Sequence, residues 1–158
     1  MNCYNSARFL REALESVWAQ TFPDWEIVFW DNRSTDESAA IFRNFDDPRF
    51  RYFLAPVHTV LGEAKGMAIE QARGEWLAFL DCDDLWLPHK LERQVALIAE
   101  EGDGPELGLV YGRMGILVEE EATRTPMGRS AIAANCRVAN KALPDGNIFA
   151  DLLKENVI

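Results

Sequence analysis

Apolar and polar residues follow two different spacings along this chain, and the two spacings alternate. Helical spacing, with apolar residues three or four positions apart, covers residues 6–18, 34–45, 60–72 and 88–100. Short apolar runs bounded by turn residues cover residues 25–30, 50–54 and 76–80. Five or six apolar residues are too few for a helix, so these runs predict buried strands. Strands that alternate with helices predict an α/β fold with a mostly parallel sheet.

Possible capping residues mark where the predicted helices begin. Ser6 precedes the first helix, and Ser34 and Glu37 have the spacing of a capping box at the second. Pro88 can be the first residue of the fourth helix. We therefore expect the serine side chains to accept hydrogen bonds from the first free amides of their helices.

The chain beyond residue 101 carries weaker signals. Turn residues at 102–105 are followed by short predicted strands at 107–111 and 116–118. Periodicity is lost over 119–146, which is typical of a surface excursion or a loop on the acceptor side of a site. A short amphipathic helix is predicted at 147–156.

Three carboxylates follow the strand predicted at 76–80, in the order Asp81-Cys82-Asp83-Asp84. Carboxylates this close repel one another unless a cation lies among them. One interpretation is helix capping, which accounts for one aspartate but leaves the third and the Asp-x-Asp spacing unexplained. The other is that Asp81 and Asp83 converge on one divalent cation, with phosphate oxygens completing its coordination.

A second polar loop follows the strand predicted at 25–30, where Asp31 and Asn32 come directly after the apolar run. The carboxyl ends of parallel strands meet at one edge of a sheet, and open α/β sheets bind their ligands there. We therefore expect the two loops to form one site.

Composition narrows the class of ligand and the compartment. The chain has 158 residues, enough for one domain with a substantial core, and 48% of them are hydrophobic. Its net charge of -10 argues against binding to nucleic acid or to an anionic membrane surface. The three cysteines lack the spacing of a zinc site or a disulfide framework, and neither a signal peptide nor an apolar run of about 18 residues is recognisable. These features predict a cytoplasmic protein.

Several motifs together resemble the family 2 glycosyltransferases. They are Tyr4-Asn5-Ser6, the segments QTFP at 20–23 and WEIVFWDNRSTD at 25–36, and ARGEW at 72–76 with the following LDCDDLWLPHKL. The resemblance covers the chain to Glu100 and is thinner at the carboxyl end. It implies a three-layer α/β/α domain of the GT-A type over residues 1–158, which transfers a sugar from a nucleotide-diphosphate donor with inversion. It further implies Mn²⁺ or Mg²⁺, a UDP- or dTDP-type donor, and a saccharide or lipid-linked acceptor. A role in cell-wall or polysaccharide biosynthesis, at the inner face of a membrane in a longer protein, would follow.

The resemblance assigns residues to both halves of the donor. Tyr4 lies where the family has an aromatic ring against the nucleobase, with core packing as the alternative. Asp31 and Asn32 match paired acidic positions, one of which accepts a hydrogen bond from the base. Because the second position is Asn, uracil and thymine both stay open.

On the phosphate side, Asp81 would contact the ribose or the metal, and Asp83 would bind the metal that bridges the diphosphate. Cys82 lies between them in the donor site. Lys65 occupies the position of a common arginine and could meet a phosphate, although a solvated helix face is the preferred interpretation.

Two other functions stay open. A haloacid-dehalogenase-type phosphohydrolase also uses Asp-x-Asp, with the first Asp as nucleophile, but has it on the first strand and has Thr or Val where this chain has Leu85. The second open function is that of a non-catalytic nucleotide-binding fragment, because we expect the catalytic base beyond Ile158. Within the chain, Glu119–Glu121, Asp145 and Asp151 are acids whose context recommends none of them.

The amino end carries a further expectation. The family's first strand precedes the Tyr-Asn pair, and here only Met1 to Cys3 do so. Unpaired strand edges attract partners, so we expect either a rearranged amino-terminal segment or another copy of the chain to fill the sheet at this position. Domain exchange or a homo-oligomer is favoured over a simple monomer.

Overall fold

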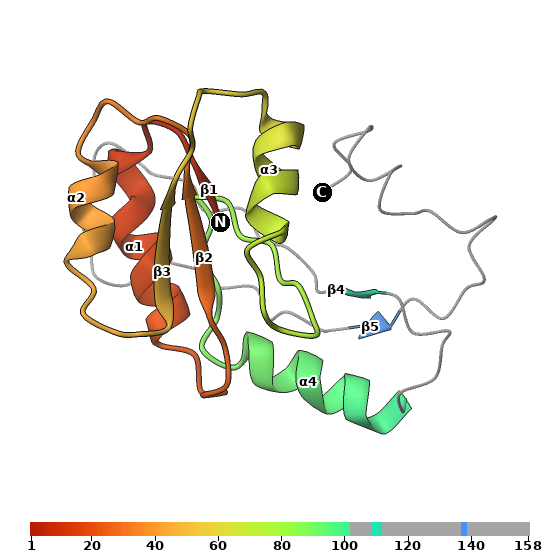
Figure 1. Cartoon of the computed structure of the whole chain (residues 1–158). Coiled ribbons are helices and arrows are strands. Elements are labelled where there is room, and N and C mark those ends of the chain that lie inside the picture. Colours follow the sequence, from red (N-terminus) through yellow and green to blue (C-terminus); the bar gives the residue numbers. More distant parts are fainter. Residues whose placement is uncertain (102–108, 112–136, 139–158) are drawn as a thin grey trace, which may run out of the picture. The chain divides into compact units, whose positions relative to one another are not determined.

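The computed structural model describes residues 1–101, 109–111 and 137–138 of the chain. Its elements, in order, are β1 (Asn2–Cys3), α1 (Ala7–Trp18), β2 (Ile27–Asp31), α2 (Ser38–Arg43), β3 (Phe50–Leu54), α3 (Leu61–Ile69), α4 (Lys90–Glu101), β4 (Val110–Tyr111) and β5 (Arg137–Val138) (Figure 1). One compact unit contains residues 1–89, and a second begins at Lys90. The predicted strand at 116–118 and the predicted helix at 147–156 lie outside the described residues.

The first unit is built on a parallel sheet with the strand order β1-β2-β3. Asn2 and Cys3 pair with Trp30 and Asp31, and all five residues of β2 pair with β3. Asn2 and Cys3 therefore form a strand of the sheet at the amino end of the chain. A homo-oligomer or domain exchange across its edge stays a prediction.

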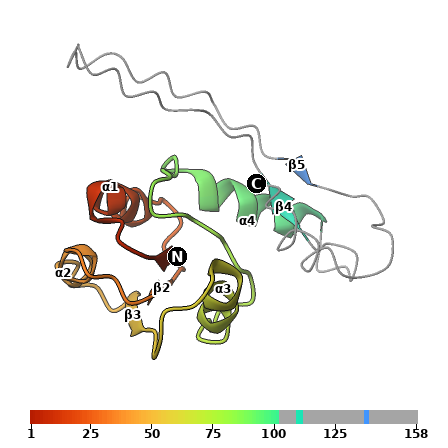
Figure 2. The ribbon, with the colours of Figure 1, turned by 90° about the horizontal axis from the view of Figure 1, so that it is seen from above.

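Side chains of β2 alternate between two apolar clusters, as the period of a strand requires. Ile27 and Phe29 belong to the cluster that contains the buried side chains of α1 and α2. Trp30, with Val28 packed beside it, belongs to the cluster formed with Ala64 and Ala68 of α3. Helices thus cover both faces of the sheet, α1 and α2 on one and α3 on the other (Figure 2). This confirms the predicted three-layer α/β/α arrangement.

The predicted helix caps are wrong in detail, because one aspartate, and neither of the predicted serines, accepts the hydrogen bonds from the first amides of the helices. Ser6 and Ser34 make no side-chain cap, and α2 begins at Ser38 rather than within a capping box. The carboxylate of Asp36 accepts hydrogen bonds from Ala7 N at 2.9 Å and from Ser38 N at 2.9 Å. It therefore caps α1 and α2 together and fixes their amino ends relative to each other.

The apolar run at 76–80 is not the buried strand that its composition predicts. Trp76, Leu77 and Phe79 are 42%, 44% and 46% exposed. Only Leu80 is buried, as part of the cluster under α1. The neighbouring strand β1 has just two residues, and the carbonyl of Asn2 accepts a hydrogen bond from the Cys82 thiol. Because β1 offers no backbone edge of matching length, the run stays irregular and the acidic turn after it does not end a strand.

The second unit is described over α4, β4 and β5. Residues of β4 and β5 pair in antiparallel register, and Gln94 on α4 donates to the carbonyl of Val110 on β4 at 3.1 Å. The predictions of a helix near residues 88–100 and of a strand ending at residue 111 are confirmed here. None of the helices in the described part of the chain has the length and apolar character needed to cross a bilayer.

Candidate functional site

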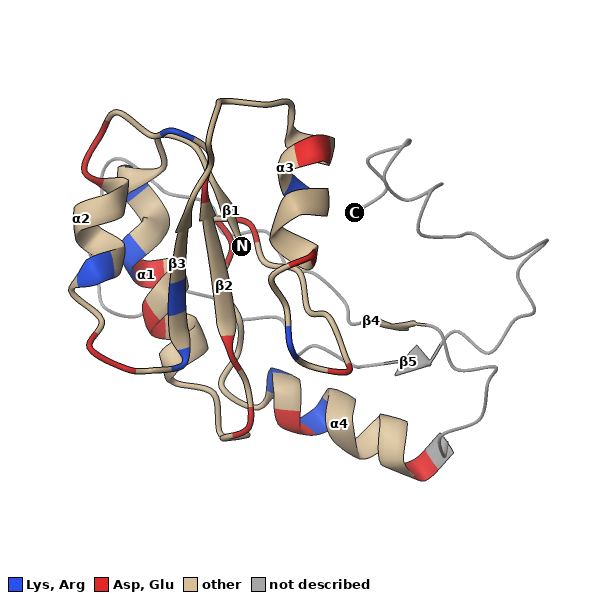
Figure 3. Ribbon diagram, in the orientation of Figure 1, with Lys and Arg blue, Asp and Glu red and all other residues tan. Residues whose placement is uncertain are grey.

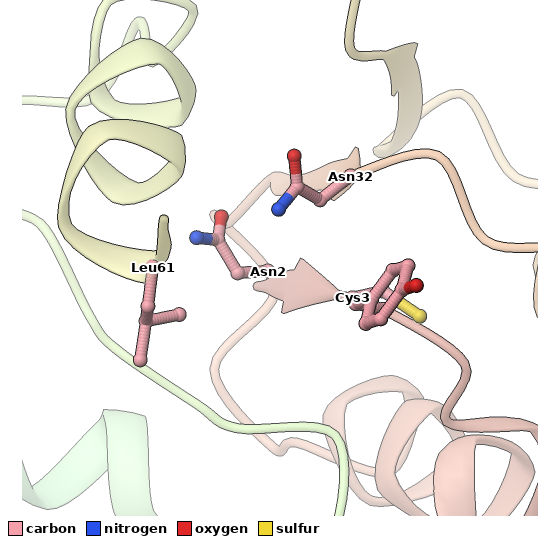
Figure 4. A pocket seen from close by; sticks show the side chains of 5 residues that line it. Asn2, Cys3, Asn32 and Leu61 are labelled. Carbon is pink, nitrogen blue, oxygen red and sulfur yellow. The ribbon is translucent and has the colours of Figure 1, made fainter. Parts of the chain in front are cut away.

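A small pocket opens where β1 and β2 end at the carboxyl edge of the sheet (Figure 4). It is lined by Asn2, Cys3, Tyr4, Asn32 and Leu61. The amide nitrogen of Asn2 is buried and has no hydrogen-bond partner in the described structure. A buried donor without a partner costs on the order of 1–3 kcal/mol, and an acceptor on a bound molecule would relieve that cost. The pocket is therefore suited to a ligand that carries a hydrogen-bond acceptor.

An aromatic pair stands at this pocket. The ring of Tyr4 is 51% exposed and lies 4.3 Å, centroid to centroid, from the ring of His58. The Nδ1 atom of His58 is 2.8 Å from the carbonyl oxygen of Asn32 and donates a hydrogen bond to it. Tyr4 is thus placed as an accessible ring rather than as part of the core.

Asn32 is buried and holds the loop that carries His58. Its amide nitrogen donates to the carbonyl of Thr59 at 2.7 Å, and its amide oxygen accepts from Thr59 N at 3.0 Å. Both polar atoms of the side chain are therefore occupied within the protein. Asn32 can contact a ligand in two ways. Either its bonds with Thr59 break, or its amide oxygen accepts a further hydrogen bond.

Asp31 is buried at the end of β2, and both of its carboxylate oxygens are bonded. One accepts from Ser34 N at 2.7 Å and the other from the hydroxyl of Tyr52 at 2.6 Å. Burial, and then this contact with Asp31, raise the pKa of Tyr52 to about 12. The carboxylate thus fixes the loop after β2 and keeps the phenol protonated.

The acidic turn lies beside β1 (Figure 3), and its Asp81 forms an ion pair with Lys65 of α3. Lys65 Nζ is 3.7 Å from a carboxylate oxygen of Asp81, and the lysine side chain is only 13% exposed. The prediction that Lys65 lies on a solvated helix face is therefore wrong. Asp83 and Asp84 are exposed at the surface. Partial desolvation of the Asp84 carboxyl, followed by the charges of Asp83 and Asp81, raises the pKa of Asp84. The three carboxylates carry more negative charge than the single lysine balances.

This donor set fits a hard divalent cation. Carboxylate oxygens are the ligands that Mg²⁺ and Mn²⁺ prefer, and Mg²⁺ is commonly held by one or two carboxylates together with substrate phosphates. In the described residues, no three His, Cys, Asp or Glu side chains gather into a set that could hold a metal ion by themselves. A cation at Asp81 and Asp83 would accordingly need oxygens from a bound ligand.

Cys82 joins the acidic turn to the pocket. Its thiol donates to the carbonyl of Asn2 at 3.0 Å, and Cys3 lies in the same buried cluster. Interaction with the neighbouring Cys82 side chain lowers the pKa of Cys3 to about 6, against the opposing effect of burial and with help from nearby serine hydroxyls. The same contact and burial raise the pKa of Cys82.

The structure thus gathers the predicted residues into two adjoining groups. Tyr4 and Asn32 line the pocket, Asp31 supports it from beneath, and Lys65, Asp81 and Cys82 form the neighbouring acidic side, with Asp83 exposed beyond them. Sequence reasoning missed Asn2 and His58, because only tertiary contacts reveal an unpaired buried amide and a ring stacked on Tyr4. The candidate bases Glu119–Glu121, Asp145 and Asp151 lie outside the described residues.

Comparison with known proteins gives a consistent result. Residues 1–141 match the family model described as Glycosyl transferase family 2. An Escherichia coli protein, UDP-Glc:alpha-D-GlcNAc-diphosphoundecaprenol beta-1,3-glucosyltransferase WfgD, is 28% identical over 117 residues, which are 74% of this chain and 45% of that protein. The putative teichuronic acid biosynthesis glycosyltransferase TuaG of Bacillus subtilis is 32% identical over 99 residues, 61% of this chain and 39% of that protein.

Solved structures show the same likeness. A crystal structure of S. aureus TarS, residues 1–349, superposes with a TM-score of 0.60 at 29% identity, covering 63% of this chain and 31% of that one. The same S. aureus protein in complex with UDP-GlcNAc gives a TM-score of 0.58 at 29% identity, covering 63% of this chain and 30% of that one. The chain spans less than half the length of each of these proteins.

Proposed function

The chain belongs to glycosyl transferase family 2, and we propose that it forms the donor-binding half of an enzyme that transfers a sugar from a nucleoside diphosphate. The observation that carries this proposal is the hydrogen bond from Cys82 to Asn2, which joins a pocket with an accessible aromatic ring to a turn of three carboxylates. A nucleotide-diphosphate sugar has the matching parts, a base at one end and a charged diphosphate at the other. Because the chain belongs to glycosyl transferase family 2, we no longer favour the haloacid-dehalogenase-type phosphohydrolase as an alternative function.

Each group then has a task in donor binding. Tyr4 lies against the base, and the unpaired amide of Asn2 donates to an acceptor on the ligand. Asn32 lines the pocket and Asp31 precedes it at the end of β2, and their oxygens can accept from the base through an additional bond or by exchanging a present partner. A uracil or thymine base offers the carbonyl oxygens that an amide donor needs.

The acidic turn serves the diphosphate. Asp81 and Asp83 would hold Mn²⁺ or Mg²⁺, which supplies Lewis-acid neutralisation of charge on the departing diphosphate. Lys65 is close enough to the turn to contribute a further positive charge to a phosphate. Cys82 keeps the two aspartates beside the pocket through its bond to Asn2.

Transfer with inversion needs one more group. An acceptor hydroxyl attacks the anomeric carbon from the face opposite the diphosphate, and a carboxylate takes its proton. We assign this base to a segment outside the described residues, either among Glu119–Glu121, Asp145 and Asp151 or beyond Ile158 in a longer protein. Loss of this base should leave donor binding intact and slow transfer, since general base catalysis contributes on the order of 10²–10⁴ in rate.

The names of the relatives support an acceptor in envelope or polysaccharide synthesis. The Escherichia coli relative is named for a diphosphoundecaprenol-linked sugar and the Bacillus subtilis one for teichuronic acid. We therefore favour a saccharide or lipid-linked saccharide acceptor, reached from the cytoplasmic side of a membrane.

A panel of nucleotides tests the proposal. Melting of the chain is measured with UDP, dTDP, CDP, GDP and ADP, each with Mn²⁺ or Mg²⁺ and with chelator. Uridine or thymidine diphosphate should raise the melting temperature when metal is present, because ligands that bind only the native state stabilise it. Asp83→Ala should remove the shift, while Asp46→Ala, an exposed acid on the turn after α2, should keep it. If no nucleotide stabilises the wild-type chain under any condition, the donor-site proposal fails.

A further inference from the structure

The segment that leaves the acidic turn is hydrogen-bonded at three consecutive residues, 86–88, to α1 and to the residues directly after it. Ser16 Oγ on α1 accepts from Trp86 N at 3.1 Å. The amide nitrogen of Gln20 donates to the carbonyl of Leu87 at 2.8 Å. Thr21 N donates to the carbonyl of Pro88 at 2.9 Å. Figure 2 shows this segment passing beside α1.

Gln20 is the central link of this fastening. It is a buried polar residue, 8% exposed, and it lies just past the end of α1. Its amide nitrogen also donates to the carbonyl of Ser16 at 3.0 Å, so the side chain is held from its own helix while it holds Leu87. These two acceptors fix the side-chain amide of Gln20 in one orientation, so that it links α1 to Leu87 as a buried, ordered contact.

The acidic turn is consequently anchored on both sides. Before Asp83, the Cys82 thiol binds the carbonyl of Asn2 on β1, and after Asp84 the backbone is tied to α1 from Trp86 onward. Only residues 83–85 span the interval between these anchors. Carboxylates that repel one another would spread if the turn were free, because like charges at this spacing disfavour a shared site.

We propose that Gln20, through Leu87, is a positioning residue that holds Asp81 and Asp83 at the separation a divalent cation and a diphosphate require. It acts on the phosphate side of the site only, since the pocket that takes the base is built from β1, β2 and α3. This inference rests on the proposed donor-binding function. It goes beyond that function by assigning a task to a residue that touches neither base, phosphate nor metal.

The proposal predicts a selective loss in Gln20→Met, which keeps the length of the side chain and removes its donor. Affinity for UDP with Mn²⁺ should weaken about tenfold, the consequence of losing roughly one hydrogen bond's contribution to the geometry of the bound site. Affinity for uridine, which has no phosphate and needs no metal, should stay unchanged. Both affinities are measured by calorimetry on folded chain, at a temperature well below the melting point of each variant.

A matched control separates positioning from general stability. Asp47→Asn weakens the contacts of Asp47 with Arg49 in the turn before β3, which is not part of the pocket or the acidic turn. It should lower the melting temperature and leave both affinities unchanged. If Gln20→Met does not fold, Ser16→Ala removes the acceptor of the neighbouring link by deleting one oxygen and should produce the same selective loss.

The outcomes are distinguishable. Selective weakening of UDP with Mn²⁺ in Gln20→Met or Ser16→Ala supports the positioning role. Unchanged UDP affinity in the folded variants, or an equal loss for uridine and UDP, overturns it and leaves Gln20 as a structural residue. Failure of the wild-type chain to bind UDP with metal overturns the donor-site proposal itself, and the positioning role with it.

Discussion

The substitution Asn32→Asp places an acid where the resemblance to the family implies the second of two paired acidic residues. We predict that this substitution destabilises the chain. The amide nitrogen of Asn32 donates to the carbonyl of Thr59 at 2.7 Å, at a site where Asn32 is only 6% exposed. A carboxylate there cannot donate and places a charged oxygen against a carbonyl oxygen. The bond to Thr59 N at 3.0 Å can survive, because it needs only an acceptor.

The magnitude follows from these contacts. Loss of one hydrogen bond removes about 1 kcal/mol, and a buried carbonyl left facing a carboxylate adds about 1–3 kcal/mol. We expect a total of about 2–4 kcal/mol, a substantial part of the 5–15 kcal/mol that typically stabilises a domain. Urea unfolding followed by tryptophan fluorescence measures this difference at pH 7.

The pH dependence gives the prediction a sign that packing alone would not. Burial against a carbonyl raises the pKa of the introduced carboxyl above its unfolded value of about 4. At neutral pH the carboxyl is ionised and cannot donate to Thr59, so the loss of stability should be full. The protonated carboxyl can donate to Thr59 and should recover part of that stability. The deficit should shrink as the pH falls through the raised folded value toward 4.

An adjacent asparagine offers a matched control. Asn5 is exposed and uses its amide oxygen to accept from Thr35 N at 2.7 Å, a bond that a carboxylate can also accept. Asn5→Asp should therefore change stability by less than about 0.5 kcal/mol. The reasoning is refuted if Asn32→Asp behaves like Asn5→Asp at pH 7, or if its deficit does not vary with pH.

Three further predictions concern groups around the site. Tyr52 should ionise near pH 12 rather than 10, because burial and then Asp31 raise its pKa, and absorbance at 295 nm referenced to Tyr52→Phe should show no folded-state transition near 10. Asp36→Ala should lower the free energy of unfolding by about 1–2 kcal/mol, measured in urea, because one carboxylate caps two helices. Hydrogen bonds to this carboxylate outweigh burial and lower the pKa of Asp36. Its contribution to stability is therefore present at neutral pH and is lost as the pH falls below about 4. Thiolate absorbance at 240 nm should rise with a midpoint near pH 6 and disappear in Cys3→Ser, whereas a midpoint near 9 would contradict the contact with Cys82.

Local pattern was sufficient for the regular elements of the first unit. The strand predicted at 50–54 matches β3, and the run at 25–30 gave β2 within two residues, because both runs are long enough to pair and are covered on both faces. The helices α1 and α3 lie within the predicted ranges, since their apolar residues recur at helical spacing.

The misses share a physical cause, which is dependence on partners distant in sequence. The apolar run at 76–80 has the composition of a strand, but strand formation also needs a backbone edge, and β1 supplies only two residues. Lys65 has a long solvent-compatible side chain, and it forms an ion pair with Asp81, sixteen residues later. The contact of Gln20 with Leu87 could not be predicted, because partners more than sixty residues apart leave no local periodicity. The unpaired side-chain amide of Asn2 could not be predicted either, because burial without a partner leaves no pattern in the sequence.

The account's central claim is that the acidic turn and the pocket bind one nucleotide together through a divalent cation. Calorimetric titration of UDP into the wild-type chain, first with Mn²⁺ and then with excess chelator, tests it most directly. We predict binding with Mn²⁺ that is lost in chelator and in Asp83→Asn, with uridine binding weakly and indifferently to metal. Equal UDP affinity with and without metal, or full metal-dependent binding by Asp83→Asn, would contradict the claim.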